Sequence, residues 1–275
     1  MYLYHFGLSE LPFTLTPNTD FYLGLKPHDE ALAVLLTALK TGEGFIKVVG
    51  EVGTGKTLIC RKLLNEMPTT FVSAYIPNPY LSPTELRRAV ASELGVSDAH
   101  NVSEQILTQK IQERLLQLHQ QGSSVVLILD EAQALPDESL EALRLFTNIE
   151  TERRKLLQVV LFGQPELDSR LATQQFRQLR QRITFSYQLR AMTQTEVSAY
   201  IGHRMHVAGY QGDAVFPASV CQQIAKASQG IPRLVNVLCH KALMLCFGQG
   251  HKQVSSQQLR TAINDTEDTQ LPLFS

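Results

Sequence analysis

The stretch Gly50-Glu51-Val52-Gly53-Thr54-Gly55-Lys56-Thr57 has the spacing G-x-x-x-x-G-K-[ST] and stands between an apolar run and a helical pattern. In such a loop the glycines allow consecutive backbone N–H groups to turn inward around phosphate oxygens, and the following helix points its positive end at the same anion. A glycine-rich turn can match the spacing by chance, but here the strand before it and the helix after it meet both context requirements. The stretch therefore predicts an ATP site on a parallel α/β fold.

Apolar runs rich in β-branched and aromatic residues lie on both sides of this loop. They predict five strands, at residues 45–49, 70–76, 125–129, 156–162 and 183–189. Helical patterns separate them, at residues 57–66, 83–94, 103–120 and 137–149. Strands that alternate with helices form a parallel sheet covered on both faces. The expected fold class is therefore α/β, a five-stranded parallel P-loop sheet flanked by helices and followed by a small all-helical lid domain.

The strand pattern ends near Arg190, and only helical patterns follow, at residues 193–207, 217–227, 231–247 and 255–264. We therefore expect a nucleotide-binding α/β domain at residues 1–190, a helical lid at 191–265 and a mobile tail at 266–275. The α/β domain would include an N-terminal collar near the sheet edge, built from Phe13, Pro17, Phe21 and Tyr22. These side chains could pack on adenine, although core packing explains them equally well.

Two carboxylates follow the third predicted strand, in Asp130-Glu131. The carboxyl ends of parallel strands share one edge of a sheet, so both are expected beside the phosphate loop. Asp130 would orient Mg²⁺ through its water shell, and Glu131 would polarise the water that attacks the γ phosphate. An acidic pair is also common at a solvent-facing strand end, but the phosphate loop in the same chain favours the catalytic interpretation.

Hydrolysis also needs groups that sense the γ phosphate and neutralise its developing charge. Gln164 follows the fourth predicted strand, which would put its amide beside the acidic pair if the two strands are neighbours. Arg177, Arg180 and Arg182 stand directly before the fifth predicted strand, with no acid near them in sequence. One of these arginines would reach the nucleotide of a neighbouring subunit, unless the cluster is a solvated basic face or a nucleic-acid patch.

Arg233 belongs to the predicted lid, in Gly230-Ile231-Pro232-Arg233. Glycine and proline fix the start of the helix, so Arg233 would project from its first turn toward a phosphate. The expected catalytic residues are Glu131, Asp130, Lys56, Gln164, Arg182 and Arg180. The expected nucleotide-binding residues are Gly50, Glu51, Val52, Gly53, Thr54, Gly55, Lys56, Thr57, Leu58 and Arg233. Lys56 would bridge the β and γ phosphates of ATP, and Thr57 with Asp130 would hold Mg²⁺.

Composition limits the classes of partner. The 275 residues include 25 Lys and Arg against 26 Asp and Glu, for a formal net charge of -1. This balance gives no global field for nucleic acid or anionic lipid. The longest apolar runs are far shorter than the roughly 20 residues that cross a bilayer, and residues 1–11 do not resemble a secretory signal. We expect no membrane span and a cytoplasmic location, at the inner face of the inner membrane if at any membrane.

Together these motifs resemble the AAA+ ATPases over essentially the whole chain. More narrowly, the chain resembles the ExeA/GspA group, whose members serve type II secretion and type IV pilus assembly. The residues that carry this narrower resemblance are Phe6-Gly7-Leu8, Pro12-Phe13, Thr16-Pro17-Asn18-Thr19, His28, Glu30-Ala31-Leu32, the phosphate loop, Asp130-Glu131-Ala132-Gln133 and Gly163-Gln164-Pro165-Glu166-Leu167. Secretion members continue into a membrane anchor and a cell-wall-binding part, and this chain stops after the lid, so direct peptidoglycan binding is not expected.

The resemblance implies further roles and partners. Arg182 would be the arginine finger, Arg233 the sensor two residue and Gln164 the sensor one residue. The implied partners are further copies of the chain, in a ring-like nucleotide-dependent oligomer, and inner-membrane proteins of pilus or secretion assembly. Two alternatives stay open. One is a DNA-bound regulator of the transposition type, for which residues 153–155 (Arg-Arg-Lys) could form a local patch, and the other is a slow nucleotide-gated scaffold.

Overall fold

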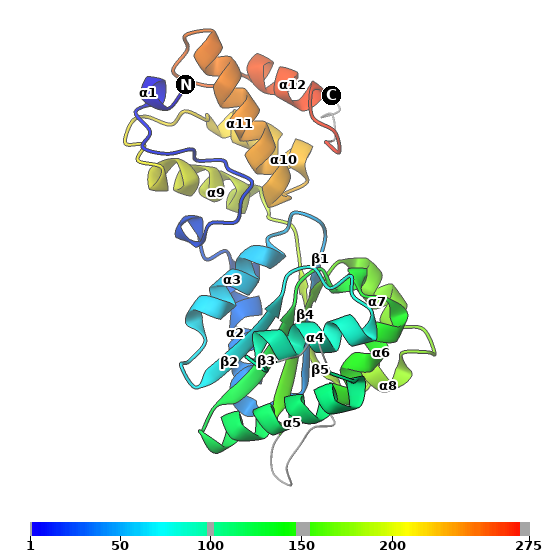
Figure 1. Ribbon diagram of the computed structural model, residues 1–275. Coiled ribbons are helices and arrows are strands. Elements are labelled where there is room, and N and C mark those ends of the chain that lie inside the picture. The colour runs from blue at the N-terminus through cyan, green and yellow to red at the C-terminus, as the bar shows by residue number, and fades with distance from the viewer. Residues whose placement is uncertain (1, 98–101, 147–154, 270–275) are drawn as a thin grey trace. The chain divides into compact units, whose positions relative to one another are not determined.

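Five parallel strands form one sheet in the computed structural model, which describes residues 2–97, 102–146 and 155–269 (Figure 1). The strand order is β2-β3-β4-β1-β5, so β3, β4 and β1 lie inside the sheet. The strands are β1 (Phe45–Gly50), β2 (Phe71–Ile76), β3 (Ser124–Leu129), β4 (Leu157–Gly163) and β5 (Ile183–Leu189). All five predicted strands and the predicted α/β fold class are thereby confirmed.

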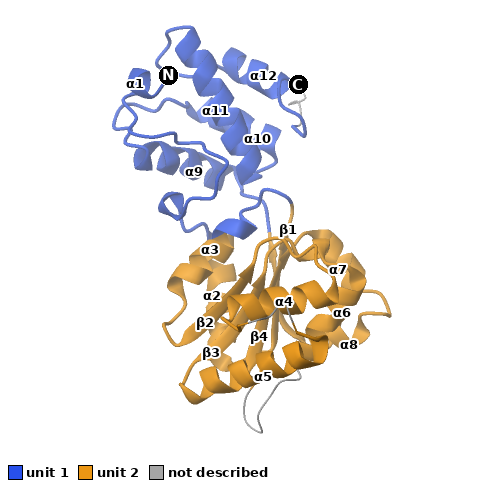
Figure 2. Cartoon of the chain, viewed as in Figure 1, with its two compact units in different colours: residues 1–26, 52–58, 190–275 blue, residues 27–51, 59–189 orange. Residues whose placement is uncertain are grey.

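The described chain divides into two compact units (Figure 2). Residues 27–51 and 59–189 make up the sheet unit, and residues 1–26, 52–58 and 190–275 make up the helical unit. The helices of the sheet unit are α2 (Lys26–Thr41), α3 (Lys56–Glu66), α4 (Pro83–Glu93), α5 (Glu104–Gln120), α6 (Asp137–Phe146), α7 (Pro165–Leu171) and α8 (Arg177–Arg180). The first residue of α2, Lys26, and the first three residues of α3 belong to the helical unit.

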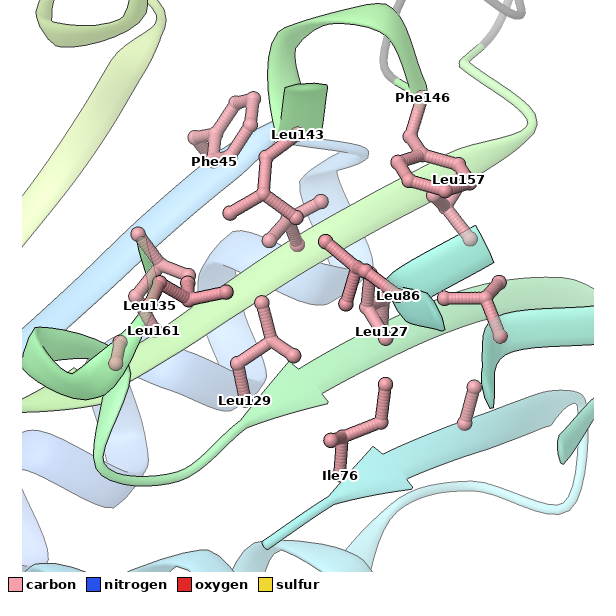
Figure 3. Close-up of a cluster of buried hydrophobic side chains, with 14 of the residues drawn as sticks. Phe45, Ile76, Leu86, Leu127, Leu129, Leu135, Leu143, Phe146, Leu157 and Leu161 are labelled. Carbon is pink, nitrogen blue, oxygen red and sulfur yellow. The ribbon is translucent and has the colours of Figure 1, made fainter. Parts of the chain in front are cut away.

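Alternate residues of the inner strands point to opposite faces of the sheet, and each face has its own apolar core. On one face, Leu127 and Leu161 pack with side chains of α4, α5 and α6, such as Leu86 and Leu143 (Figure 3). On the other face, Ile128 and the strand residues beside it pack with α2 and α3. Because both faces are covered, the inner strands read as continuous apolar runs, and their positions can be found from sequence.

The helical unit contains α1 (Tyr2–Phe6), the 3-10 turn η1 (Thr19–Phe21), α9 (Gln194–Val207), α10 (Ala218–Ser228), α11 (Pro232–Gly248) and α12 (Ser256–Asn264). Helices α9 and α12 begin with full capping boxes, at Thr193 and Ser255, which satisfy backbone N–H groups at each helix start. The four helices predicted after residue 190 match α9 to α12. Residues 270–275 of the predicted tail lie outside the described residues.

The N-terminal segment differs from the sequence-based expectation. Residues 1–26 belong to the helical unit, whereas we expected them to form a collar of the α/β domain. Phe13 and Phe21, each 2 % exposed, share a core with α9, α10 and α11. The buried guanidinium of Arg204 lies 4.5 Å from the ring centre of Phe21 and donates to the carbonyl of Pro12. The apolar side chains of the segment therefore pack in the core of the helical unit.

The four cysteines Cys60, Cys221, Cys239 and Cys246 are all buried and free. Among residues 2–97, 102–146 and 155–269, no helix combines the length and the apolar character that a membrane span requires.

Candidate functional site

The candidate site residues of the sheet unit lie at the carboxyl edge of the sheet. Val49 of β1 pairs with Gly163 of β4, and Leu129 of β3 pairs with Leu161 of β4. Three chain segments therefore leave the same edge. They are the phosphate loop after β1, the acidic pair after β3 and Gln164 after β4.

The backbone of the phosphate loop adopts the conformation that its glycines permit. Gly53 and Gly55 have φ values of 81° and 100°, in a region that other residues rarely occupy. Helix α3 begins at Lys56, so the loop leads directly into a helix N-terminus. Consecutive N–H groups and a helix dipole directed at one point make a cradle for a phosphate group.

Two polar side chains of the loop are buried rather than solvated. Thr54 is 2 % exposed and Lys56 is 5 % exposed. An ammonium group is costly to bury unless it meets a compensating charge or hydrogen-bond acceptors, and a triphosphate supplies both. Thr57 in the first turn of α3 and Asp130 after β3 carry hard oxygen ligands of the kind that Mg²⁺ takes. The loop residues therefore fit the phosphates of a nucleotide, and Asp130 carries an oxygen ligand of the kind that suits Mg²⁺.

Arg233 lies against the loop within the helical unit. Its backbone N–H donates to the carbonyl of Gly53 at 3.2 Å. A Cβ atom built on Gly53 would lie 2.6 Å from Cβ of Arg233 and 3.1 Å from Cγ2 of Ile231. Helix α11 begins at Pro232, so Arg233 occupies its first turn as the Gly-x-Pro-Arg motif predicts. Glycine at position 53 is required both by its φ and by this close approach.

The acidic pair is held by the backbone around it. Asp130 is 2 % exposed, and its backbone N–H donates to the carbonyl of Ile76 at 3.1 Å. Its Oδ1 atom accepts from the backbone N–H of Glu131 at 3.0 Å. Glu131 has a φ of 53°, a left-handed conformation that costs a non-glycine residue about 1–2 kcal/mol. Such strain persists where the surroundings enforce it, and it concentrates at functional sites.

Two glutamine side chains converge on Glu131. Its Oε2 atom accepts from Nε2 of Gln133 at 2.5 Å and from Nε2 of Gln164 at 3.1 Å. The Oε1 atom of Gln133 in turn accepts from the backbone N–H of Gln164 at 3.0 Å. The structure thus brings together Gln164 and Glu131, which the sequence places beside each other only if β3 and β4 are neighbours. It adds Gln133, which the predicted site does not include.

Arg170 of α7 holds the segment that carries Gln133. Its guanidinium donates to the carbonyls of Gln133 and Leu135, each at 2.8 Å, and pairs with the carboxylate of Asp137. This residue is also absent from the predicted site. The sequence signal for Gln133 is a polar residue two positions after the acidic pair. Arg170 has no such signal, because its role depends on how α7 folds back.

The three arginines before β5 have different surroundings. Arg180 donates to the carbonyls of Leu171 and Ala172, at 3.2 and 2.7 Å, and so caps the carboxyl end of α7. Arg182 is partly buried and donates to the carbonyl of Arg144 at 3.5 Å. Arg177 is exposed at the start of α8.

The charge of Asp130 also acts on its neighbours in the sheet unit. Burial raises the pKa of the Cys60 thiol above its ordinary value, and the Asp130 carboxylate raises it further. Burial likewise raises the pKa of Tyr75 to about 12, with smaller contributions from Cys60 and Asp130. Both groups therefore stay protonated and uncharged near neutral pH.

Comparison with known proteins gives a consistent assignment. Residues 39–171 match the family model described as "AAA domain". The chain is 42 % identical over 254 residues to General secretion pathway protein A of Aeromonas hydrophila. That match covers 92 % of this chain and 46 % of the relative, so the chain spans about half the length of the relative it matches.

Solved structures share the fold at low sequence identity. The Aeropyrum pernix ORC2 protein, in ADPNP–ADP complexes, is 16 % identical with a TM-score of 0.68, over 93 % of this chain and 73 % of that one. Cdc6p of Pyrobaculum aerophilum is 18 % identical with a TM-score of 0.68, over 91 % and 71 % of the two chains. The Thermotoga maritima RuvB branch migration motor is 16 % identical with a TM-score of 0.56, over 93 % and 73 %. The protein therefore contains an AAA domain, has the fold of AAA P-loop ATPases, and is related over most of its length to General secretion pathway protein A.

Proposed function

We propose that this protein is a Mg²⁺-dependent ATPase that drives or organises the assembly of a secretion system or type IV pilus at the inner membrane. The observation that carries the enzymatic part is the carboxylate of Glu131, which two amide groups hold directly after Asp130. The segment that carries Glu131 leaves the same edge of the sheet as the phosphate loop.

The residues divide the work of binding and hydrolysis. The backbone N–H groups of residues 50–57 hold the phosphates, and Lys56 neutralises the β and γ groups. Thr57 and Asp130 hold Mg²⁺, which when bound withdraws charge from the phosphate oxygens. Arg233 contacts a phosphate from the first turn of α11. The neutral amide of Gln164 senses the γ phosphate and orients the attacking water.

The chemical step transfers one phosphoryl group to water. The water oxygen bonds to the γ phosphorus, the bond from that phosphorus to the bridging oxygen breaks, and ADP leaves with that electron pair. Glu131 accepts a proton of the water as the new bond forms. Arg182 supplied by a neighbouring copy would neutralise the charge that develops, which makes turnover depend on a ring-like oligomer.

The proposed role in secretion rests on the similarity to General secretion pathway protein A. That relative is a protein of the general secretion pathway, and the match covers 92 % of this chain. The narrower resemblance stated from sequence favours MshM, the ATPase of mannose-sensitive haemagglutinin pilus biogenesis. On this proposal the protein works in the cytoplasm, peripheral to the inner membrane, with assembly proteins of that machinery as its partners.

Steady-state hydrolysis of ATP by the intact chain and by Glu131→Gln tests the proposal. The wild type should release phosphate only with Mg²⁺ present, and Glu131→Gln should bind ATP equally well with kcat lower by a factor on the order of 10² to 10⁴. A wild-type rate that is negligible and unchanged by the substitution would instead identify a nucleotide-gated scaffold. In a separate experiment, affinity capture of Glu131→Gln from cells should recover inner-membrane assembly proteins.

The alternative to the secretion role is DNA binding. The basic stretch at residues 153–155 suggests this alternative, and residues 153 and 154 lie outside the described residues. Titration of duplex DNA at several salt concentrations distinguishes the two roles, because neutralised phosphates make affinity fall steeply with salt. Tight binding with a steep salt slope would contradict a role confined to secretion or pilus assembly.

A further inference from the structure

The side chain of Gln133 uses both ends of its amide. Its Nε2 donates to Oε2 of Glu131 at 2.5 Å, and its Oε1 accepts from the backbone N–H of Gln164 at 3.0 Å. A reversed amide would set oxygen against the carboxylate and an NH₂ group against an N–H, so these two partners fix its orientation. Gln133 therefore links Glu131, which follows β3, to Gln164, which follows β4, and its amide has one defined orientation.

The surroundings keep this bridge in place. The backbone carbonyl of Gln133 accepts from Arg170 of α7 at 2.8 Å, so the backbone of the residue is held as well as its side chain. A Cβ atom built on Gly163 would lie 2.7 Å from Cδ2 of Leu167 and 3.5 Å from Oε1 of Gln133. A side chain at position 163 would therefore clash with Leu167 and would lie at ordinary contact distance from the amide of Gln133.

The bridge acts on a strained residue. Glu131 has a φ of 53°, and a left-handed glutamate needs external contacts to stay in a single conformation. Both amide donors reach the same oxygen, Oε2. An oxygen that already accepts two hydrogen bonds is a poor proton acceptor for a further donor, so Oε1 is the oxygen left to receive a proton from water.

We propose that Gln133 is a positioning residue for hydrolysis, which ties Oε2 of Glu131 to the end of β4 and thereby presents Oε1 to the attacking water. This role rests on the proposed ATPase function. Because Gln133 accepts from the backbone N–H of Gln164, the orientation of the Glu131 carboxylate depends on that backbone. A shift of the β4 end caused by the γ phosphate therefore moves Glu131 through Gln133. Gln133 itself touches neither water nor nucleotide in this scheme.

Two variants of the intact chain test the role. Gln133→Glu keeps an oxygen that accepts from the N–H of Gln164 but loses the donor to Glu131, and Gln133→Leu loses both. Each should lower kcat by a factor on the order of 10², as expected for a misplaced catalytic group, with KM and the affinity for ATP unchanged. The matched control is Gln158→Leu at the opposite end of β4, where Nε2 donates to the carbonyls of Leu39 and Glu43 at 3.2 and 2.9 Å. This control should lower the Tm at least as much as Gln133→Leu and leave kcat unchanged.

Coupling to Glu131 separates positioning from simple stabilisation. In a Glu131→Gln background, Gln133→Leu should lower kcat no further, since the residue acts through the missing carboxylate. An equal loss of kcat in both backgrounds, or full kcat in both Gln133 variants, would overturn the role while leaving the ATPase proposal intact. A wild type whose hydrolysis does not depend on Glu131 would overturn both.

Discussion

The backbone N–H of Arg233 donates to the carbonyl of Gly53 at 3.2 Å, and this bond joins the first turn of α11 to the phosphate loop. Both residues lie in the helical unit, so the loop and Arg233 are parts of one compact body. A phosphate held by the loop and a guanidinium from the first turn of α11 are thus placed with respect to each other by the chain itself.

Gly53→Ala should weaken nucleotide binding. Its φ of 81° strains any other residue by about 1–2 kcal/mol, and the new Cβ would overlap Cβ of Arg233. The matched control is Gly42→Ala, with a φ of 82° and nothing within 4 Å of its Cβ. Thermal denaturation should show a loss for both variants, whereas an ATP titration should show weaker binding for Gly53→Ala alone. Equal ATP affinities would mean that the contact with Arg233 does not shape the loop.

Lys56→Ala should strongly weaken ATP binding, because no other cation in the loop can neutralise the β and γ phosphates. We expect affinity to fall by at least about 10², the equivalent of one charge-assisted contact of about 3 kcal/mol. Lys62→Ala is the control, since Lys62 lies on the same helix and pairs with Glu66 at 3.0 Å. Titration with a fluorescent ATP analogue measures both, and unchanged affinity for Lys56→Ala would refute the site.

The arginines before β5 should separate into a structural and a catalytic group. Arg180 caps α7, so Arg180→Ala should lower the free energy of unfolding as lost caps do, by about 1 kcal/mol. Arg182→Ala should lower kcat by a factor on the order of 10³ or more without loss of ATP binding. If Arg182 acts on a neighbouring copy, mixing Arg182→Ala with Glu131→Gln should restore part of the turnover. No recovery at any mixing ratio would exclude action between subunits.

Glu196 should make the helical unit sensitive to acid. Hydrogen bonds from Arg190, at 2.7 and 2.8 Å, followed by those from Thr193, lower the pKa of Glu196 to about 2 from an ordinary value of 4.5. A depressed pKa in the folded state means that the stabilisation is complete above pH 4.5 and is lost as the pH falls toward 2.

Glu196→Gln should therefore lower the free energy of unfolding at pH 7, by about 1 kcal/mol given the partial exposure of the pair, and flatten its decline between pH 4.5 and 2. Chemical denaturation across that pH range measures the effect. Parallel declines for both proteins would show that the pair with Arg190 does not control acid stability.

Sequence patterns located the buried strands because both faces of an inner parallel strand are covered, which leaves an unbroken apolar run such as Val125 to Leu129. Helix α2 is not among the predicted helices, although Ala31, Leu35, Ala38 and Leu39 have helical spacing and are all buried. The segment with Phe13 and Phe21 shows a second limit of the sequence. An apolar residue in a sequence indicates burial, but it does not indicate which core the side chain enters.

The site divides in the same way. The phosphate loop and the acidic pair are local motifs, so consecutive residues carry their chemistry. Gln133 and Arg170 contribute through contacts between segments that follow different strands, and such contacts depend on strand order and on how α7 folds back. The left-handed backbone of Glu131 has no sequence signature at all, because glycine, the usual sign of that conformation, is absent there.

The core that takes in Phe13 and Phe21 also has a consequence for synthesis on the ribosome. Both side chains pack with α9, α10 and α11, which are translated only after the whole sheet unit. At about 5–20 residues per second, the first segment waits many seconds with its aromatic residues exposed to solvent. The nascent chain therefore presents an apolar segment near its N-terminus throughout translation of the sheet, which is the kind of segment that a ribosome-associated chaperone shields.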